Sequence, residues 1–264
     1  MRTKLGISLR RQRLIYLRDL VREMVARDMK LRYKRSILGI TWSLLNPLTQ
    51  LLVFSFLFRS VMPLHIPNYP SFVFTGVLAW SWFQSALFTA AGAITDNREL
   101  IKRPGFPPAI LPVVTVTTNL VHFLLALPIL LTFAALGGGR LTGAIVMLPL
   151  VILLQFLLIL GLGYFVATFH VTFRDTQHLL GVFLMLLFYL TPVFYDTSII
   201  PARYQALYRL NPMLHLITAY RTILVQGSWP DFRTLLPLSA FIGALLWLGH
   251  AVFTRASYHF VEEL

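Results

Sequence analysis

Residues 143–169 read GAIVMLPLVILLQFLLILGLGYFVATF and contain no Asp, Glu, Lys or Arg. A helix of about 20 such residues is long enough to cross the hydrocarbon core of a bilayer. Comparable uncharged stretches lie at residues 37–58, 71–94, 109–136, 179–195 and 234–254. The sequence therefore predicts an all-α membrane protein with six transmembrane helices.

The overall composition supports a membrane protein. The mean hydropathy is +0.71, 57% of the residues are hydrophobic and 12% are charged, whereas about a quarter of the residues in a soluble domain are charged. The net charge of +13 raises the question of nucleic acid. No basic stripe alternates with exposed aromatic residues, so we expect no nucleic-acid partner. Because the chain has no cysteine, disulfides, thiol catalysis and thiolate metal sites are excluded.

The positive charge is concentrated at the N-terminus, where residues 1–35 contain 12 of the 23 Lys and Arg. Cytoplasmic segments of membrane proteins carry an excess of these residues. With six spans, this rule predicts that both termini are cytoplasmic, with 17 basic residues inside and 6 outside. The segment 196–231 fits this topology least well, because it is expected outside and contains Arg203, Arg209 and Arg221.

Residues 1–36 are expected to form a basic cytoplasmic or interfacial segment that precedes a transmembrane domain over residues 37–264. Within it, residues 12–31 have the pattern of an amphipathic helix, with apolar and basic residues on different faces. The apolar face contains Leu14, Leu17, Val21, Met24 and Val25. We expect this helix to lie in the inner membrane interface, in contact with membrane lipids.

Two connecting segments have a structure of their own. On the outer side, Pro201 is suited to open a helix that runs to Leu210, and a second helix is expected over residues 213–225. Both are too short and polar to span, so they are interpreted as re-entrant or interfacial helices, or else as a surface hairpin.

On the inner side, Asp96 and Glu99 have the spacing of a capping box for a short helix. Leu100 and Ile101 would form an apolar ridge on it. Such a ridge could dock into a partner's groove or lie flat on the bilayer.

The residue pattern gives little support to other kinds of membrane protein. Only His122 and His250 are ionisable within the spans, and a lone intramembrane His is more often a hydrogen-bonded packing residue than a proton relay. No H-E-x-x-H pattern, paired carboxylates or phosphate-binding loop is present. We therefore expect a transporter rather than an enzyme, with energy supplied by another subunit.

Four blocks of sequence occur in order along the chain. They are KLRYKRSILGITW (30–42) with NPL (46–48), NRELIK (97–102) with Phe106 and Pro107, RDTQ (174–177), and LTPV (190–193) with Tyr195, Pro201 and Asn211-Pro212. Together these blocks resemble the permease subunits of type-2 ABC transporters that export polysaccharides.

The resemblance implies a homodimeric channel in the bacterial inner membrane that works with a separate ABC ATPase subunit. ATP and Mg²⁺ would bind to that subunit, and no cofactor is expected in this chain. The expected substrate is a lipid-linked, O-antigen-like polysaccharide. The alternatives are a wall teichoic acid or capsule exporter, a drug or lipid exporter of the same fold, and a multi-span enzyme acting on lipid-linked sugars.

The resemblance also suggests roles for particular residues. A coupling segment that contacts the ATPase would contain Asn97, Arg98, Glu99, Leu100, Ile101, Lys102 and Phe106, a second cytoplasmic loop would contain Arg174 and Asp175, and an outer gate would contain Pro201, Tyr204, Asn211 and Pro212. A polysaccharide is too wide for the interior of one six-helix bundle, so we expect the conduit between two protomers. Aromatic rings can stack weakly on sugars, and the candidates are Trp42, Tyr189, Phe194 and Tyr195.

Overall fold

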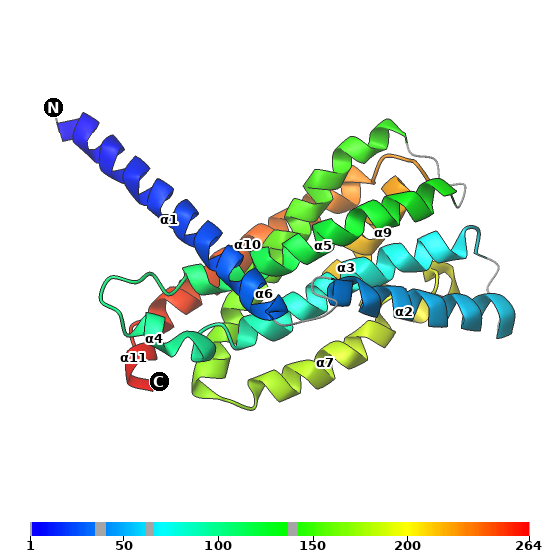
Figure 1. Cartoon of the computed structure of the whole chain (residues 1–264). Coiled ribbons are helices and arrows are strands. Elements are labelled where there is room, and N and C mark those ends of the chain that lie inside the picture. The colour runs from blue at the N-terminus through cyan, green and yellow to red at the C-terminus, as the bar shows by residue number, and fades with distance from the viewer. Residues whose placement is uncertain (1, 35–40, 62–65, 137–141, 264) are drawn as a thin grey trace.

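The computed structural model describes residues 2–34, 41–61, 66–136 and 142–263, and over these residues the chain forms helices and no strands. Its long helices run side by side in a bundle from which one end of α1 projects (Figure 1). The helices are α1 (Arg2–Tyr33), α2 (Trp42–Phe56), α3 (Tyr69–Ala91), α4 (Arg98–Ile101), α5 (Ile110–Leu136), α6 (Leu148–Thr172), α7 (Thr176–Leu190), α8 (Ala202–Arg209), α9 (Pro212–Leu224), α10 (Phe232–Ala256) and α11 (Phe260–Glu263).

Each predicted span coincides largely with a helix, but the helices differ in length. Among the described residues, four helical segments are long and apolar enough to cross a membrane: Tyr69–Ala91, Ile110–Ala135, Gly143–Thr172 and Phe232–Ala256. The apolar helical parts of the first and fifth predicted spans are shorter, at Leu45–Phe56 and Thr176–Leu190. Residues 37–40, with which the first predicted span begins, lie outside the described part of the chain.

The helix of the fifth predicted span, α7, ends five residues before the predicted end of that span at residue 195. Thr191 has extended backbone angles, and α7 stops at Leu190. A residue that precedes proline is biased away from the helical conformation, and Pro192 follows Thr191. Residues 191–195 therefore continue from α7 as a non-helical segment.

Helix α3 lies at the centre of the bundle. It packs against α2, α5, α6, α7 and α9, and most of its side chains from Tyr69 to Ala91 are buried. A helix that is apolar on all sides is stable in such an enclosed position.

Helices α6 and α10 approach each other closely. A Cβ atom on Gly249 would collide with the carbonyl oxygen of Gly161, and one on Gly161 would lie 3.0 Å from the backbone nitrogen of Leu246. Small residues allow the backbones of membrane helices to approach this closely. The two glycines therefore fix the spacing between α6 and α10.

A helix covers the predicted residues 12–31 and is longer than predicted, because α1 runs from Arg2 to Tyr33. Met24 is buried, and Leu17, Val21 and Val25 pack against the bundle core, whereas Leu14 is 67% exposed. The C-terminal half of α1 lies along α5, and the N-terminal half projects away from the bundle (Figure 1).

The two short helices that follow α7 differ in their burial. No residue of α8 is buried, whereas nine residues of α9 are. Helix α9 packs against α3, α6 and α10. Asn211 accepts a hydrogen bond from the backbone nitrogen of Met213 and caps α9, with Pro212 in its first turn. The surface-hairpin interpretation thus describes α8 and does not describe α9.

Candidate functional site

The segment expected to couple to an ATPase lies at the end of the bundle where α3 ends and α5 begins. It consists of a 3-10 turn, Thr95–Asn97, followed by α4. Ile101 is 5% exposed and belongs to the chain's own core, and Leu100 and Phe106 pack partly against that core. The expected exposed ridge of Leu100 and Ile101 is therefore wrong for Ile101.

The predicted capping box is also absent. The residues that precede the 3-10 turn and α4 make no side-chain capping bond. The Asn97 side chain instead donates to the carbonyl oxygen of Ala93 at 3.0 Å and accepts from Arg27 of α1 at 3.3 Å. Because these bonds join α1 to the turn before α4, the amphipathic helix and the coupling segment form one surface.

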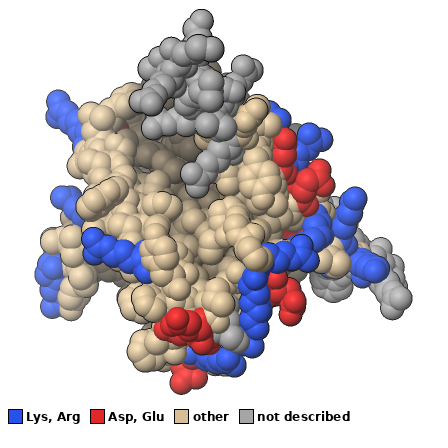
Figure 2. Space-filling model, turned by 90° about the vertical axis from the view of Figure 1, so that its left-hand side faces the viewer, with Lys and Arg blue, Asp and Glu red and all other residues tan. Residues whose placement is uncertain are grey.

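The second loop expected on the cytoplasmic side lies between α6 and α7. Arg174 and Asp175 are both exposed. Thr172 donates a hydrogen bond to Glu263 at 2.9 Å, which brings α11 to this loop. Figure 2 views this end of the molecule and shows Lys and Arg side chains around much of its rim. A surface of this kind can attract anionic lipid headgroups or an acidic protein surface.

Three of the four conduit candidates lie together in an aromatic cluster between α2 and α7. The α2–α7 aromatic cluster consists of Phe54, Phe58, Phe188, Tyr189, Phe194 and Tyr195. Phe194 is at its centre, with ring centroids 5.2 Å from Phe54 and 5.6 Å from Phe58. Tyr189 is 59% exposed, so one ring of the cluster remains accessible.

The fourth conduit candidate, Trp42, begins α2, and its side chain lies outside the described part of the structure. Phe54 and Phe58 are members of the cluster that were not predicted from the sequence. Their spacing of four residues places both rings on one face of the chain, and this pattern was visible in the sequence.

Arg221 of α9 holds together the end of the bundle where α3 begins and α7 ends, a role that was not predicted from the sequence. It is 5% exposed. Its guanidinium donates to the carbonyl oxygens of Phe72, Pro192 and Val193 at 3.2, 2.7 and 2.6 Å, and it lies 3.4 Å from the centroid of the Phe72 ring.

The contacts of Arg221 join α9, α3 and the non-helical segment that follows α7. A Cβ atom on Gly76 would collide with Val193 and Arg221, so glycine is needed for this close approach. Asn211 adds a second connection, because its amide donates to the Thr191 hydroxyl at 2.8 Å. Asn211 and Pro212, two of the expected gate residues, therefore begin the helix that contains Arg221.

The other two gate candidates lie at the molecular surface. Pro201 occupies the position before α8. Tyr204 is 45% exposed, and the Arg203 guanidinium lies 4.6 Å from the centroid of its ring. These residues do not contact Arg221, so the four gate candidates fall into two separate groups.

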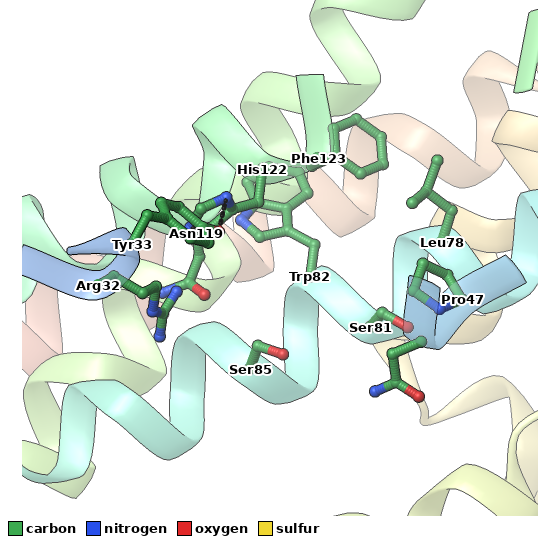
Figure 3. A pocket seen from close by; sticks show the side chains of 11 residues that line it. Arg32, Tyr33, Pro47, Leu78, Ser81, Trp82, Ser85, Asn119, His122 and Phe123 are labelled. Carbon is green, nitrogen blue, oxygen red and sulfur yellow. Dashed lines mark hydrogen bonds between the residues drawn. The ribbon is translucent and has the colours of Figure 1, made fainter. Parts of the chain in front are cut away.

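A cavity of about 420 Å³ lies between the end of α1, the start of α2 and the middle of α3 and α5 (Figure 3). It is lined by Arg32, Tyr33, Asn46, Pro47, Leu78, Ser81, Trp82, Ser85, Asn119, His122 and Phe123. The Tyr33 hydroxyl and His122 are hydrogen-bonded at 3.2 Å, so the expected hydrogen bond of His122 is present. Among the described residues, no three His, Asp or Glu side chains gather closely enough to hold a metal ion.

Comparison with known proteins assigns this architecture to a family. The ABC-2 type transporter model matches residues 19–225, and the chain belongs to that family. The chain is similar to the O-antigen export system permease protein RfbA of Myxococcus xanthus, with 39% identity over 94% of this chain and 96% of that protein. It is 31% identical to the protein of the same name from Klebsiella pneumoniae, with the same coverage of both chains. The polysialic acid transport protein KpsM of Escherichia coli is 25% identical over 88% of this chain and 92% of that protein.

Proposed function

We propose that this chain is the membrane-spanning permease subunit of an ATP-driven exporter, and that the exporter moves a lipid-linked, O-antigen-like polysaccharide outward across the bacterial inner membrane. The observation that carries this proposal is 39% identity to an O-antigen export permease over nearly the full length of both chains. A capsule-type polysaccharide is the second candidate substrate, favoured by the similarity to the polysialic acid transport protein.

The chain crosses the membrane six times, with both termini in the cytoplasm. Helix α2 together with the π-helical turn Leu57–Val61 covers 20 residues, or roughly 30 Å, which matches the hydrocarbon thickness. Cysteine substitutions in this cysteine-free chain can test the topology with membrane-impermeant labels. Labelling of position 102 from outside, or of position 205 from the cytoplasm, would contradict it.

The helix of the fifth span, α7, is followed by a non-helical segment, and Arg221 supplies hydrogen bonds that this segment does not make within a helix. Non-helical backbone within the membrane is tolerated where other groups satisfy its hydrogen bonds. The guanidinium of Arg221 donates to two carbonyl oxygens of the segment after α7. This arrangement supports α9 as a re-entrant helix that enters from the outer side.

The coupling segment and the second cytoplasmic loop contact the ATPase subunit, which binds ATP and Mg²⁺. The contact surface formed by α4 and the two residues after it is charged, because Glu99, Lys102 and Arg103 are exposed whereas Ile101 is buried. Charged pairs at such a surface favour correct orientation and rapid association.

The conduit forms between two copies of this chain. Helices α2 and α7 expose large apolar side chains, including Leu52 and Phe56 on α2 and Leu179 and Phe183 on α7. Exposed apolar faces of this kind mark contacts with lipid or with another protein chain, and we assign these two to a second protomer because the α2–α7 aromatic cluster lies between them. The α2–α7 aromatic cluster would then border the path of the sugar chain.

Deletion of the gene in its host tests the proposal directly. Surface polysaccharide should disappear, and the lipid-linked glycan should accumulate on the cytoplasmic side of the inner membrane. A plasmid copy of this chain should restore export only while the ATPase subunit is active. Normal surface polysaccharide in the deletion strain would refute export, and an altered glycan structure would favour the enzyme alternative.

A further inference from the structure

The cavity shown in Figure 3 is rich in hydrogen-bond donors and contains no carboxylate in its lining. Arg32 contributes a guanidinium, and Ser81 and Ser85 contribute hydroxyls. Within the described residues, no Asp or Glu oxygen lies within 4.0 Å of Arg32. This chemistry favours a ligand with several negatively charged oxygen atoms.

The indole of Trp82 gives independent evidence for a ligand. Trp82 is 3% exposed, and its Nε1 atom is buried without a hydrogen-bond partner among the described residues. The ring lies against Phe123 and beside His122 at the cavity wall (Figure 3). A buried donor without a partner is costly, and a ligand oxygen that reached Nε1 as the cavity wall adjusts on binding would remove that cost.

The depth of the cavity suits a lipid headgroup that has moved inward from the cytoplasmic interface. Ser85 and Ser81 lie roughly 9 and 15 Å along α3 from the end of the helix at Ala91. A second cavity of about 480 Å³ shares Arg32 and Asn119 with the first and extends toward Asp96. Asp28 and Asp96 line this second cavity and do not line the first one, which we call the deeper cavity. Asp28 is paired with Arg27 at 3.0 Å.

We propose that the deeper cavity binds the phosphate headgroup of a lipid, with Arg32 contacting its charge and the Trp82 indole donating a hydrogen bond. The headgroup belongs either to the diphosphate of a lipid-linked substrate or to an anionic phospholipid. The proposal rests on the proposed function, because it concerns the site at which that exporter would hold its lipid before transport.

Equilibrium binding to the purified permease–ATPase complex in detergent micelles tests the proposal. The probe is a fluorescent polyprenyl diphosphate, and the matched control ligand is the uncharged polyprenol. Arg32→Gln removes the charge, and Trp82→Phe removes the indole donor while keeping a ring against Phe123. Arg22→Gln is the control variant, because Arg22 is an exposed residue of α1 that lines neither cavity.

We expect each cavity variant to weaken binding of the diphosphate about tenfold and Arg22→Gln to leave it unchanged. Phosphatidylglycerol and inorganic pyrophosphate, added as competitors, identify the source of the headgroup. Efficient displacement by phosphatidylglycerol indicates a general anionic phospholipid, and poor displacement indicates the diphosphate substrate. The proposal is overturned if polyprenol binds as tightly as the diphosphate, if pyrophosphate competes as well as a lipid, or if the cavity variants match the control.

Cell-surface polysaccharide, measured for the same variants, separates this inference from the proposed function. If the wild-type chain supports export and the cavity variants bind the diphosphate normally, the cavity proposal alone fails. If the wild-type chain does not support export, the proposed function fails, whatever the cavity binds.

Discussion

At the scale of single residues, Arg221 shows how a charge can be retained inside an apolar structure. Burial of an unpaired charge is costly, and each of the three carbonyl bonds of Arg221 offsets part of that cost. The sequence places Arg221 on the outer side without indicating its burial, because topology rules treat every Arg outside the spans alike. Its position within the apolar helix α9 was the signal that indicated burial.

Replacement of Arg221 by Met should destabilise the permease, because three carbonyl oxygens would lose their donors at about 1 to 3 kcal/mol each. Arg221→Lys, which retains a donor group, should be intermediate. The midpoint of thermal unfolding in detergent measures the effect, and Arg209→Met on the exposed helix α8 is the control. Equal midpoints for the Arg221→Met and control proteins would show that Arg221 does not hold α9, α3 and the segment after α7 together.

The exposed ring of the α2–α7 aromatic cluster should affect the rate of transport. Tyr189→Ala should slow polysaccharide export several-fold and leave dimer formation and ATP hydrolysis intact, since weak stacking would guide the sugar without holding it. Export is followed by pulse labelling of surface polysaccharide. Phe241→Ala on α10 removes a ring of similar exposure far along the chain from this cluster. If both variants export at the same rate, Tyr189 does not border the conduit.

At the scale of elements, the contact between α6 and α10 depends on two glycines that allow the helices to approach closely. Gly249→Ala should destabilise the protein by about 1 to 3 kcal/mol, because the added methyl group would collide with the Gly161 carbonyl. Gly243→Ala is a matched control on the same helix, since a Cβ there meets no atom within 4 Å. The order of the two unfolding midpoints checks the claim, and a lower midpoint for Gly243→Ala would contradict it.

Within the coupling segment, substitutions of exposed residues should affect contact with the ATPase, whereas substitution of the buried Ile101 should affect folding of the permease. Lys102→Glu combined with Arg103→Glu should leave insertion normal and weaken association with the ATPase, because both side chains are exposed. Ile101→Asp should instead lower the yield of folded permease, because it places a charge in the core. Co-purification measures both effects, with Arg255→Glu at the end of α10 as the control. Unchanged association for the double variant would favour a helix that lies on the membrane.

At the scale of the whole molecule, most of the helical architecture could be predicted from the sequence. Inside a bilayer the backbone must satisfy its own hydrogen bonds, so an uncharged stretch of sufficient length is restricted to a helix. The early end of α7 was also predictable in part from Pro192. The orientation of Ile101 was not, because a four-residue helix is too short for its periodicity to indicate a buried face. The deeper cavity combines Arg32 with Asn119, which are remote in sequence, and local patterns do not show that they meet.

We propose that this chain forms the membrane path for a lipid-linked polysaccharide and that a separate ATPase subunit supplies the energy. Inverted membrane vesicles with both subunits and the lipid-linked glycan on their outer surface test it most directly. The predicted result is that the glycan becomes protected inside the vesicles with its covalent structure unchanged, and only when ATP, the ATPase and this chain are all present. Protection without ATP or without this chain, or chemical conversion of the glycan, would contradict the claim.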